Sequence, residues 1–125
     1  MELKEQLSVN EVVETYQRAW SEEGPAQRRL LELVLTEDAE LVQPNGRAGG
    51  RDAVLQRIAG LNDRWPGASV VITSGADEHH GFVRYTWELR GPESVLLTGF
   101  DIGELAPDGR LRRVVQFFGP FPPAS

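Results

Sequence analysis

One carboxylate, Asp101, stands in the middle of a stretch that alternates like a β-strand, residues 95–105. Side chains two positions apart share a face of a strand, so Asp101 shares its face with small or apolar residues: Leu97, Gly99, Gly103 and Leu105. A carboxylate is expected on such a face where the face lines a cavity. Apolar surroundings raise the pKa of a carboxyl group, which suits Asp101 to give a proton or a hydrogen bond to a ligand oxygen. The alternative is a structural aspartate that is hydrogen-bonded to the backbone or paired with Arg84.

The neighbours of Asp101 on the following strand depend on one turn. Asp108-Gly109 is a strong signal for a tight hairpin. Such a turn pairs Asp101 with Gln116 and places Val114 and Phe118 beside it. The predicted wall around Asp101 is therefore one amide and two apolar groups.

The preceding strand, residues 82–90, admits two registers. If Pro92 and Glu93 form a two-residue turn, Arg84 lies opposite Asp101 on the same face, together with Thr86 and Glu88. A one-residue bulge instead turns the alternating large residues to that face: Tyr85, Trp87 and Leu89. The sequence leaves both registers open.

Three further side chains could shape a ligand site. Tyr16 and Trp20 lie one turn apart on the apolar stripe of a predicted helix, where aromatic residues can face a ligand or simply pack in the core. Gln43 ends a predicted strand. Its amide can orient a ligand or a water molecule but cannot accept a proton at a useful pH, and the alternative is an ordinary polar residue at a strand end.

Composition excludes several kinds of chemistry. The chain has no cysteine, which excludes disulfides, thiolate metal sites and cysteine nucleophiles. The one lysine, Lys4, lies in the predicted N-terminal tail, so a Schiff base or a phosphate-binding lysine has no candidate. A net charge of −6 and a pI of about 4.9 disfavour nucleic-acid binding. His79 and His80 are adjacent and would point in opposite directions on an extended chain, so they do not match a metal site. The glycines of residues 46–50 lack the spacing of a nucleotide-binding loop. We therefore expect no metal and no cofactor.

Length and hydropathy indicate one soluble domain. The 125 residues suffice for a single core, which we place at about residues 8–119 with tails at 1–7 and 120–125. No apolar run approaches the length of a membrane span. The first residues, MELKEQLS, lack the pattern of a signal peptide, so we expect a cytoplasmic protein that contacts no membrane.

The elements that must position these side chains change from helical to strand periodicity halfway along the chain. Three helices are predicted, from a capping box at Ser8 to about Glu22, from Pro25 to Leu35, and from Asp52 to Trp65. A short strand at 39–42 and a loop through 43–50 lie between the second and third helices. Four strands follow, at 68–75, 82–90, 95–105 and 111–118. Helices followed by an antiparallel meander predict an α+β fold with the helices on one sheet face.

The last two strands resemble those of a known superfamily. The segments that carry the resemblance are Thr98-Gly99-Phe100-Asp101-Ile102-Gly103-Glu104-Leu105, Asp108-Gly109-Arg110-Leu111 and Val115-Gln116-Phe117-Phe118-Gly119. They look like the SnoaL-like branch of the nuclear-transport-factor-like superfamily, which includes polyketide cyclases, ketosteroid isomerases and limonene-epoxide-type hydrolases. The resemblance covers about residues 8–119. It implies a cone-shaped α+β barrel of the cystatin-like type, in which three N-terminal helices pack on a curved antiparallel sheet that encloses a pocket.

The resemblance also implies roles for single residues. Asp101 matches an acid of the ketosteroid isomerases and cyclases, and Tyr16 would join it in an oxyanion hole. The chain departs from the isomerases at Gln43, where their general base is an aspartate followed by proline. It departs from the epoxide hydrolases at Thr86, because that family would have a carboxylate two residues after Arg84.

We therefore hypothesise a cofactor-independent isomerase or cyclase that acts by acid/base chemistry from Asp101, with Tyr16, on a small apolar or amphipathic ligand that bears oxygen. The expected ligand-binding residues are Trp20, Gln43, Arg84, Gln116 and Phe118. Two alternatives stay open: a non-catalytic ligand-binding or dimerisation module, and an epoxide hydrolase. The opposite sheet face carries apolar residues that should be covered, most simply in a homodimer, which the resemblance also implies: Leu96, Phe100, Ile102, Val115 and Phe117.

Overall fold

A computed structural model describes residues 7–124. Lys4 and the rest of the predicted tail up to residue 6 lie outside the described residues. The three predicted helices are confirmed as α1 (Val9–Ala19), α2 (Gly24–Val34) and α3 (Arg51–Arg64). Ser8 and Glu11 form the predicted capping box, in which each side chain accepts a hydrogen bond from the backbone of the other, at 3.1 and 2.8 Å.

The strands comprise β1 (Leu35–Gln43), β2 (Gly46–Gly49), β3 (Ser69–Ile72), β4 (Asp77–His79), β5 (Phe82–Arg90), β6 (Val95–Leu105) and β7 (Leu111–Phe118). The last three have the predicted boundaries. β1 is longer than predicted and begins at Leu35, where α2 was expected to end, because its buried residues pair with β7. β2 and β4 were expected to be loops. Their sequences carry glycines or charges, and only pairing with β1 and β5 makes them strands.

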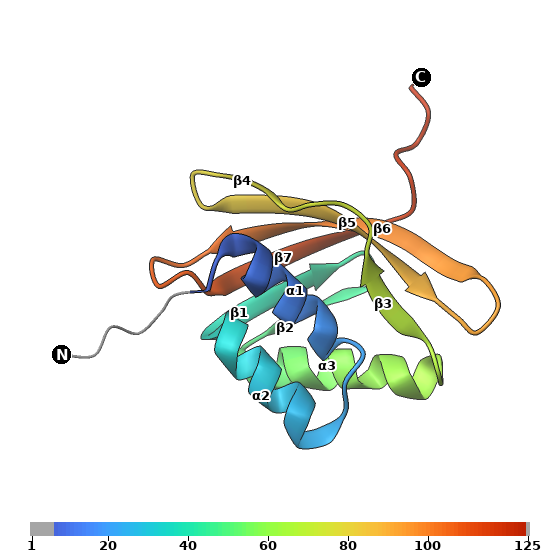
Figure 1. The fold of residues 1–125 in the computed structure, drawn as a ribbon, viewed down its shortest axis with the longest axis horizontal. Coiled ribbons are helices and arrows are strands. Elements are labelled where there is room, and N and C mark those ends of the chain that lie inside the picture. The colour runs from blue at the N-terminus through green and yellow to red at the C-terminus, as the bar shows by residue number, and fades with distance from the viewer. Residues whose placement is uncertain (1–6, 125) are drawn as a thin grey trace.

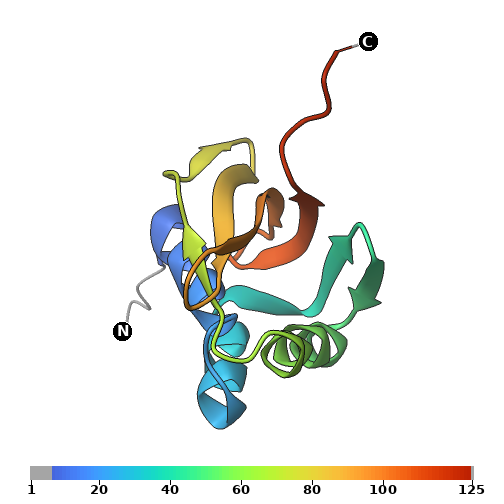
Figure 2. The ribbon, with the colours of Figure 1, turned by 90° about the vertical axis from the view of Figure 1, so that its right-hand side faces the viewer.

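The sheet is curved, mixed and open (Figures 1 and 2). Its strand order is β2-β1-β7-β6-β5-β3, with β4 paired to β5 off this path. The α+β class and the three helices on one sheet are confirmed, but β1 runs parallel to β7, so the sheet is not wholly antiparallel as predicted. β1 and β7 are far apart in the sequence, and no local turn signal could reveal their direction. The two edge strands, β2 and β3, do not pair, so the barrel does not close.

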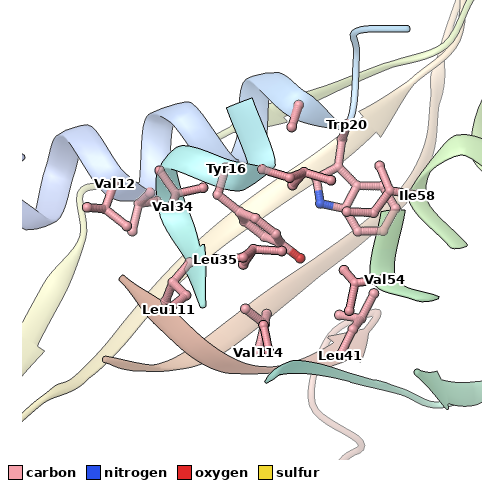
Figure 3. Packing of buried hydrophobic residues seen from close by; sticks show 14 of the residues in the cluster. Val12, Tyr16, Trp20, Val34, Leu35, Leu41, Val54, Ile58, Leu111 and Val114 are labelled. Carbon is pink, nitrogen blue, oxygen red and sulfur yellow. The ribbon is translucent and has the colours of Figure 1, made fainter. Parts of the chain in front are cut away.

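The hydrophobic core fills the space between the helices and the inner face of this sheet (Figure 3). Figure 3 shows Tyr16 reaching from α1 into a cluster formed by Leu35, Leu41, Val54 and Val114. Each of these side chains is at most 2% exposed, and full burial of one such side chain contributes about 1.5–3 kcal/mol. The core therefore anchors α1 and α3 to β1 and β7. Within residues 7–124, no helix is both long and apolar enough to cross a membrane.

Candidate functional site

The register between β5 and β6 decides which residues surround Asp101. Tyr85 is the direct partner of Asp101, and Arg84 is paired with Ile102. Of the two registers that the sequence leaves open, the one that places Arg84 opposite Asp101 is therefore wrong. The reason is a β-bulge at the start of β6. Leu89 pairs with Leu97 and Arg90 pairs with Val95, so Leu96 has no paired residue on β5. The bulge alternative is confirmed, and it turns Tyr85, Trp87 and Leu89 inward, where each is at most 4% exposed.

Asp101 is buried, at 1% exposure, and both of its carboxylate oxygens accept hydrogen bonds from β5. The Tyr85 hydroxyl donates to Oδ2 and the Trp87 indole Nε1 donates to Oδ1, each at 2.7 Å. Space for the indole comes from Gly99, which faces Trp87 across the strands. A Cβ atom at Gly99 would lie 2.3 Å from Trp87 Cζ2 and 2.3 Å from the carbonyl oxygen of Phe117. The glycine beside Asp101 thus allows a large donor to reach the carboxylate.

Burial dominates the electrostatics of this carboxyl group. The pKa of Asp101 is raised from 3.8 to about 6, because the loss of solvation on burial outweighs the hydrogen bonds from Tyr85, Trp87 and Gln116, which lower it. Burial also raises the pKa values of Tyr85 and Tyr16, and the charge of Asp101 raises both further. At neutral pH about one Asp101 side chain in ten carries a proton. A group that can hold either protonation state near pH 7 is suited to acid/base chemistry.

A row of polar side chains leads from Asp101 toward the surface. Gln116 pairs with Asp101 across β6 and β7, which confirms the predicted register of that hairpin. Gln43 Nε2 donates to Gln116 Oε1 at 2.7 Å. Arg57, from α3, donates through Nε to Gln43 Oε1 and through a terminal nitrogen to Asn45 Oδ1, the latter at 3.1 Å. Gln43 and Gln116, two of the predicted ligand-binding residues, are thereby brought together.

A small inner cavity of about 60 Å³ adjoins this row. Its wall combines two amides with aromatic and aliphatic side chains: Trp20, Gln43, Leu61, Val70, Trp87, Leu89, Leu97, Gln116 and Phe118. Phe118 meets Trp87 edge to face, with ring centroids 6.1 Å apart. Four predicted ligand-binding residues therefore share one cavity. Asp101 is not part of the wall and lies behind Trp87 and Gln116, which both bond to it.

Tyr16 is placed differently from the expectation. Its ring is fully buried and contacts Trp20 edge to face, with centroids 6.3 Å apart. Its hydroxyl makes no hydrogen bond of ordinary geometry among the described residues, although the Trp20 indole and the charge of Asp101 both act on it. The tyrosine hydroxyl that bonds to Asp101 belongs to Tyr85. The predicted partnership of Tyr16 with Asp101 is therefore not seen as a hydrogen bond, because the bulge delivers a closer hydroxyl from β5.

Arg84 lies on the outer face of the sheet, where its guanidinium bonds to Asp77 of β4 at 2.8 Å. Both side chains are more than half exposed. They line an outer groove of about 710 Å³ formed by β5, β6, residues 73–77 and the C-terminal segment 119–121. Arg84 therefore does not share the inner cavity with the other predicted ligand-binding residues, and Thr86 and Glu88 line the outer groove with it.

The sequence indicates Tyr85 and Trp87 only as one of two alternatives, and it does not indicate Arg57 as a site residue. Tyr85 and Trp87 depended on a bulge that the sequence marks only by the apolar run Val95-Leu96-Leu97. Arg57 gave no signal, because an arginine on a predicted helix is ordinarily a solvated residue. No group of three or more potential metal-ligating side chains occurs within residues 7–124.

Comparison with known proteins identifies related chains. A family model described as a SnoaL-like domain matches residues 13–114. A crystal structure from Agrobacterium tumefaciens, described as a "putative isomerase of the SnoaL-like family", is 28% identical, with a TM-score of 0.81 over 87% of this chain and 95% of that chain. No curated protein matches the sequence.

More distant solved structures share the fold. A "putative SnoaL-like polyketide cyclase" from a Jannaschia species is 15% identical, with a TM-score of 0.70 over 93% of this chain and 91% of that chain. An NTF2-like protein of unknown function from Cytophaga hutchinsonii is 16% identical, with a TM-score of 0.71 over 94% of this chain and 96% of that chain. At these identities the likeness concerns the fold alone.

Proposed function

Because the chain belongs to the SnoaL-like domain family, we propose that it binds a small, largely apolar, oxygen-bearing molecule in its inner cavity and acts on it by acid/base chemistry from Asp101, as an isomerase or cyclase does. The observation that carries the proposal is a buried carboxyl group, with its pKa raised to about 6, one side chain behind a cavity wall. The Agrobacterium relative described as a "putative isomerase" supports the same reaction class.

The cavity wall suits such a ligand. Trp20, Leu61 and Phe118 offer apolar surface, and Gln43 and Gln116 offer amides that can hydrogen-bond to an oxygen. The volume of about 60 Å³ is far below the roughly 300 Å³ of a typical ligand pocket. Ligand entry therefore requires side chains of the wall to move.

Asp101 can reach a ligand once one of its donors is displaced. Trp87 and Gln116 line the cavity and hydrogen-bond to Asp101, so a ligand that moves either side chain meets the carboxyl group. The Tyr85 hydroxyl remains bonded to the other oxygen and holds the group in place. Gln43 cannot supply a second base, so Asp101 has to serve both as base and as acid.

Cyclohexanone is a suitable probe, because it is small, apolar and carries one carbonyl oxygen. Binding is followed by NMR through the side-chain amides of Gln43 and Gln116 and the indoles of Trp20 and Trp87. Acid/base chemistry is followed as the exchange of its α-protons for deuterium in D₂O. We expect shifts at the cavity residues and protein-dependent exchange that Asp101→Asn abolishes. Absence of both effects at millimolar probe would contradict the proposal.

A non-catalytic binding module is the second candidate, and one observation favours it. Both oxygens of Asp101 are already hydrogen-bonded and the carboxyl group does not line the cavity. If the protein only binds ligands, cyclohexanone shifts the same resonances. Its α-protons then exchange no faster in the presence of the wild-type protein than in the presence of Asp101→Asn. An epoxide hydrolase is not supported, because Arg84 and Thr86 face outward.

For the partner, we propose that the outer sheet face binds a second copy of this chain. Apolar side chains are exposed there, among them Phe82 at 47%, Ile102 at 38% and Phe117 at 44%. Phe117 stacks on Phe100 with ring centroids 4.9 Å apart, and Phe121 of the C-terminal segment contacts Phe100. Exposed apolar patches of this kind mark interfaces. Native mass spectrometry should detect a dimer, and a purely monomeric protein at micromolar concentration would contradict this assignment.

A further inference from the structure

Arg57 stands at the outer end of the polar row that leads to Asp101. It is half-buried on α3, and it contacts the turn between β1 and β2 on one side and Gln43 on the other. Gly46, the first residue of β2 after that turn, has a φ of +151°, and a Cβ atom there would lie 2.5 Å from an Arg57 terminal nitrogen. The backbone at Gly46 thus makes room for the guanidinium group and helps to fix its place.

A guanidinium group can only donate hydrogen bonds, and this property gives the row a direction. Because Arg57 Nε donates to Gln43, the Gln43 amide must turn its oxygen toward Arg57. Its nitrogen then donates to Gln116 Oε1 at 2.7 Å. With its oxygen occupied, Gln116 has only its nitrogen left to face Asp101, where a hydrogen bond from Gln116 lowers the pKa of the carboxyl group.

We propose that Arg57 is a positioning residue for Asp101: it orients the amides of Gln43 and Gln116 so that a donor, rather than an acceptor, faces the carboxylate. Arg57 itself touches neither Asp101 nor the inner cavity. It acts through two amides whose orientation would otherwise be free, since an amide presents a donor or an acceptor depending on a half-turn.

The positioning role of Arg57 stands without the proposed function, and only its effect on catalysis rests on that function. If Asp101 is the acid and base of the reaction, Arg57 sets how readily it holds its proton. The other groups that act on Asp101 are the hydroxyls of Tyr85 on β5 and Tyr16 on α1, the Trp87 indole and the Gln116 amide. The hydroxyls and the indole are unchanged when Arg57 or Gln43 is replaced, whereas the Gln116 amide is the group expected to turn.

The test is NMR titration of the Asp101 carboxyl carbon in the ligand-free protein, so it does not depend on finding a substrate. In Gln43→Glu the new carboxylate keeps Arg57 as its partner but can only accept, which forces Gln116 to turn its nitrogen outward and its oxygen toward Asp101. We expect the pKa of Asp101 to rise by about one unit or more, a tenfold higher proton affinity.

Asn45→Asp is the matched control, because it adds the same charge beside the same arginine without touching either amide. We expect it to shift the pKa of Asp101 by less than about 0.3 unit, as for an exposed charge screened by solvent. Equal shifts in Gln43→Glu and Asn45→Asp, or no shift in either, would overturn the proposal.

A second pair of variants covers the case in which Gln43→Glu does not fold. Arg57→Met removes every donor at a similar side-chain length and should raise the pKa of Asp101, since Gln43 is then free to turn. Arg57→Lys keeps a donor and should restore the pKa to within about 0.3 unit of the wild-type value. If Arg57→Met leaves the pKa of Asp101 unchanged while the protein stays folded, Arg57 has no positioning role.

Discussion

On the inner face of β5 and β6, Tyr85, Trp87 and Asp101 are buried and hydrogen-bonded to one another. On the outer face, one residue away along the same strands, Arg84 pairs with Asp77 in solvent and Ile102 is exposed. The two faces contain similar residue types, an acid with its donors and large apolar groups. Burial makes the difference, because it shifts the pKa of Asp101, whereas the outer ion pair stays screened by water.

One bulged residue decides which side chains surround Asp101. Leu96 stands outside the pairing of β5 with β6, and this offset turns Tyr85 rather than Arg84 toward Asp101. An aspartate beside an arginine would be a fixed ion pair with a lowered pKa. An aspartate beside a tyrosine and an indole can exchange its proton near neutral pH.

The largest expected effect is that of Gly99→Ala on the inner face. Its methyl group would collide with the Trp87 ring and with the backbone oxygen of Phe117, which cannot both yield. We expect a loss of about 4 kcal/mol in the free energy of unfolding, from overpacking together with a weakened bond between Trp87 and Asp101. Urea denaturation measures it. Gly60→Ala is the control, because nothing lies near its Cβ position on α3, and it should stabilise the protein by about 0.5–1 kcal/mol.

Next in size is the pH dependence of stability that Asp101 imposes. Its pKa of about 6 in the folded state lies above its ordinary value of 3.8, so between these values the folded protein binds the proton more tightly than the unfolded chain does. Its contribution is therefore fully present below about pH 4 and is lost as the pH rises through about 6. Relative to Asp101→Asn, the wild type should lose roughly 2–2.5 kcal/mol of stability from pH 4 to pH 7. A difference between the two proteins that is flat, or that grows with pH, would argue against a raised pKa.

Replacing Tyr85 by Phe should cost about 2 kcal/mol at pH 7, the contribution of a hydrogen bond to a buried charged group. The same variant should raise the pKa of Asp101, because that bond favours the charged form. Arg84→Met provides the outer-face counterpart and should cost no more than about 0.5 kcal/mol, since its ion pair is exposed. Similar costs for both variants, measured by chemical denaturation, would contradict the contrast between the two faces.

The smallest effect on monomer stability is expected for Ile102→Thr on the outer face. The free energy of unfolding of the monomer should change by less than about 0.5 kcal/mol, because Ile102 is exposed and threonine also favours strands. The fraction of dimer in native mass spectrometry should fall, because Ile102 belongs to the apolar surface proposed for pairing. An unchanged dimer fraction would place the interface elsewhere.

The sequence predicts much of this fold and part of the site, for physical reasons. Helix caps, strand alternation and the Asp108-Gly109 turn are local signals, and they place the helices, β5, β6, β7 and the pairing of Asp101 with Gln116. The parallel pairing of β1 with β7 is a long-range feature without a local signal. Within the site, Gln116 and Gln43 are found from the sequence. The inward position of Tyr85 depends on the bulge at Leu96, which the alternation of residues along the strands does not reveal.

Whether burial raises the pKa of Asp101 can be measured directly by NMR titration of its carboxyl carbon in the wild-type protein. We expect a pKa of about 6, because Asp101 is 1% exposed and three donors offset only part of the cost of burying its charge. A pKa at or below the ordinary value of 3.8 would mean that the hydrogen bonds outweigh burial. Asp101 would then be a fixed structural anion and could not act as an acid at neutral pH.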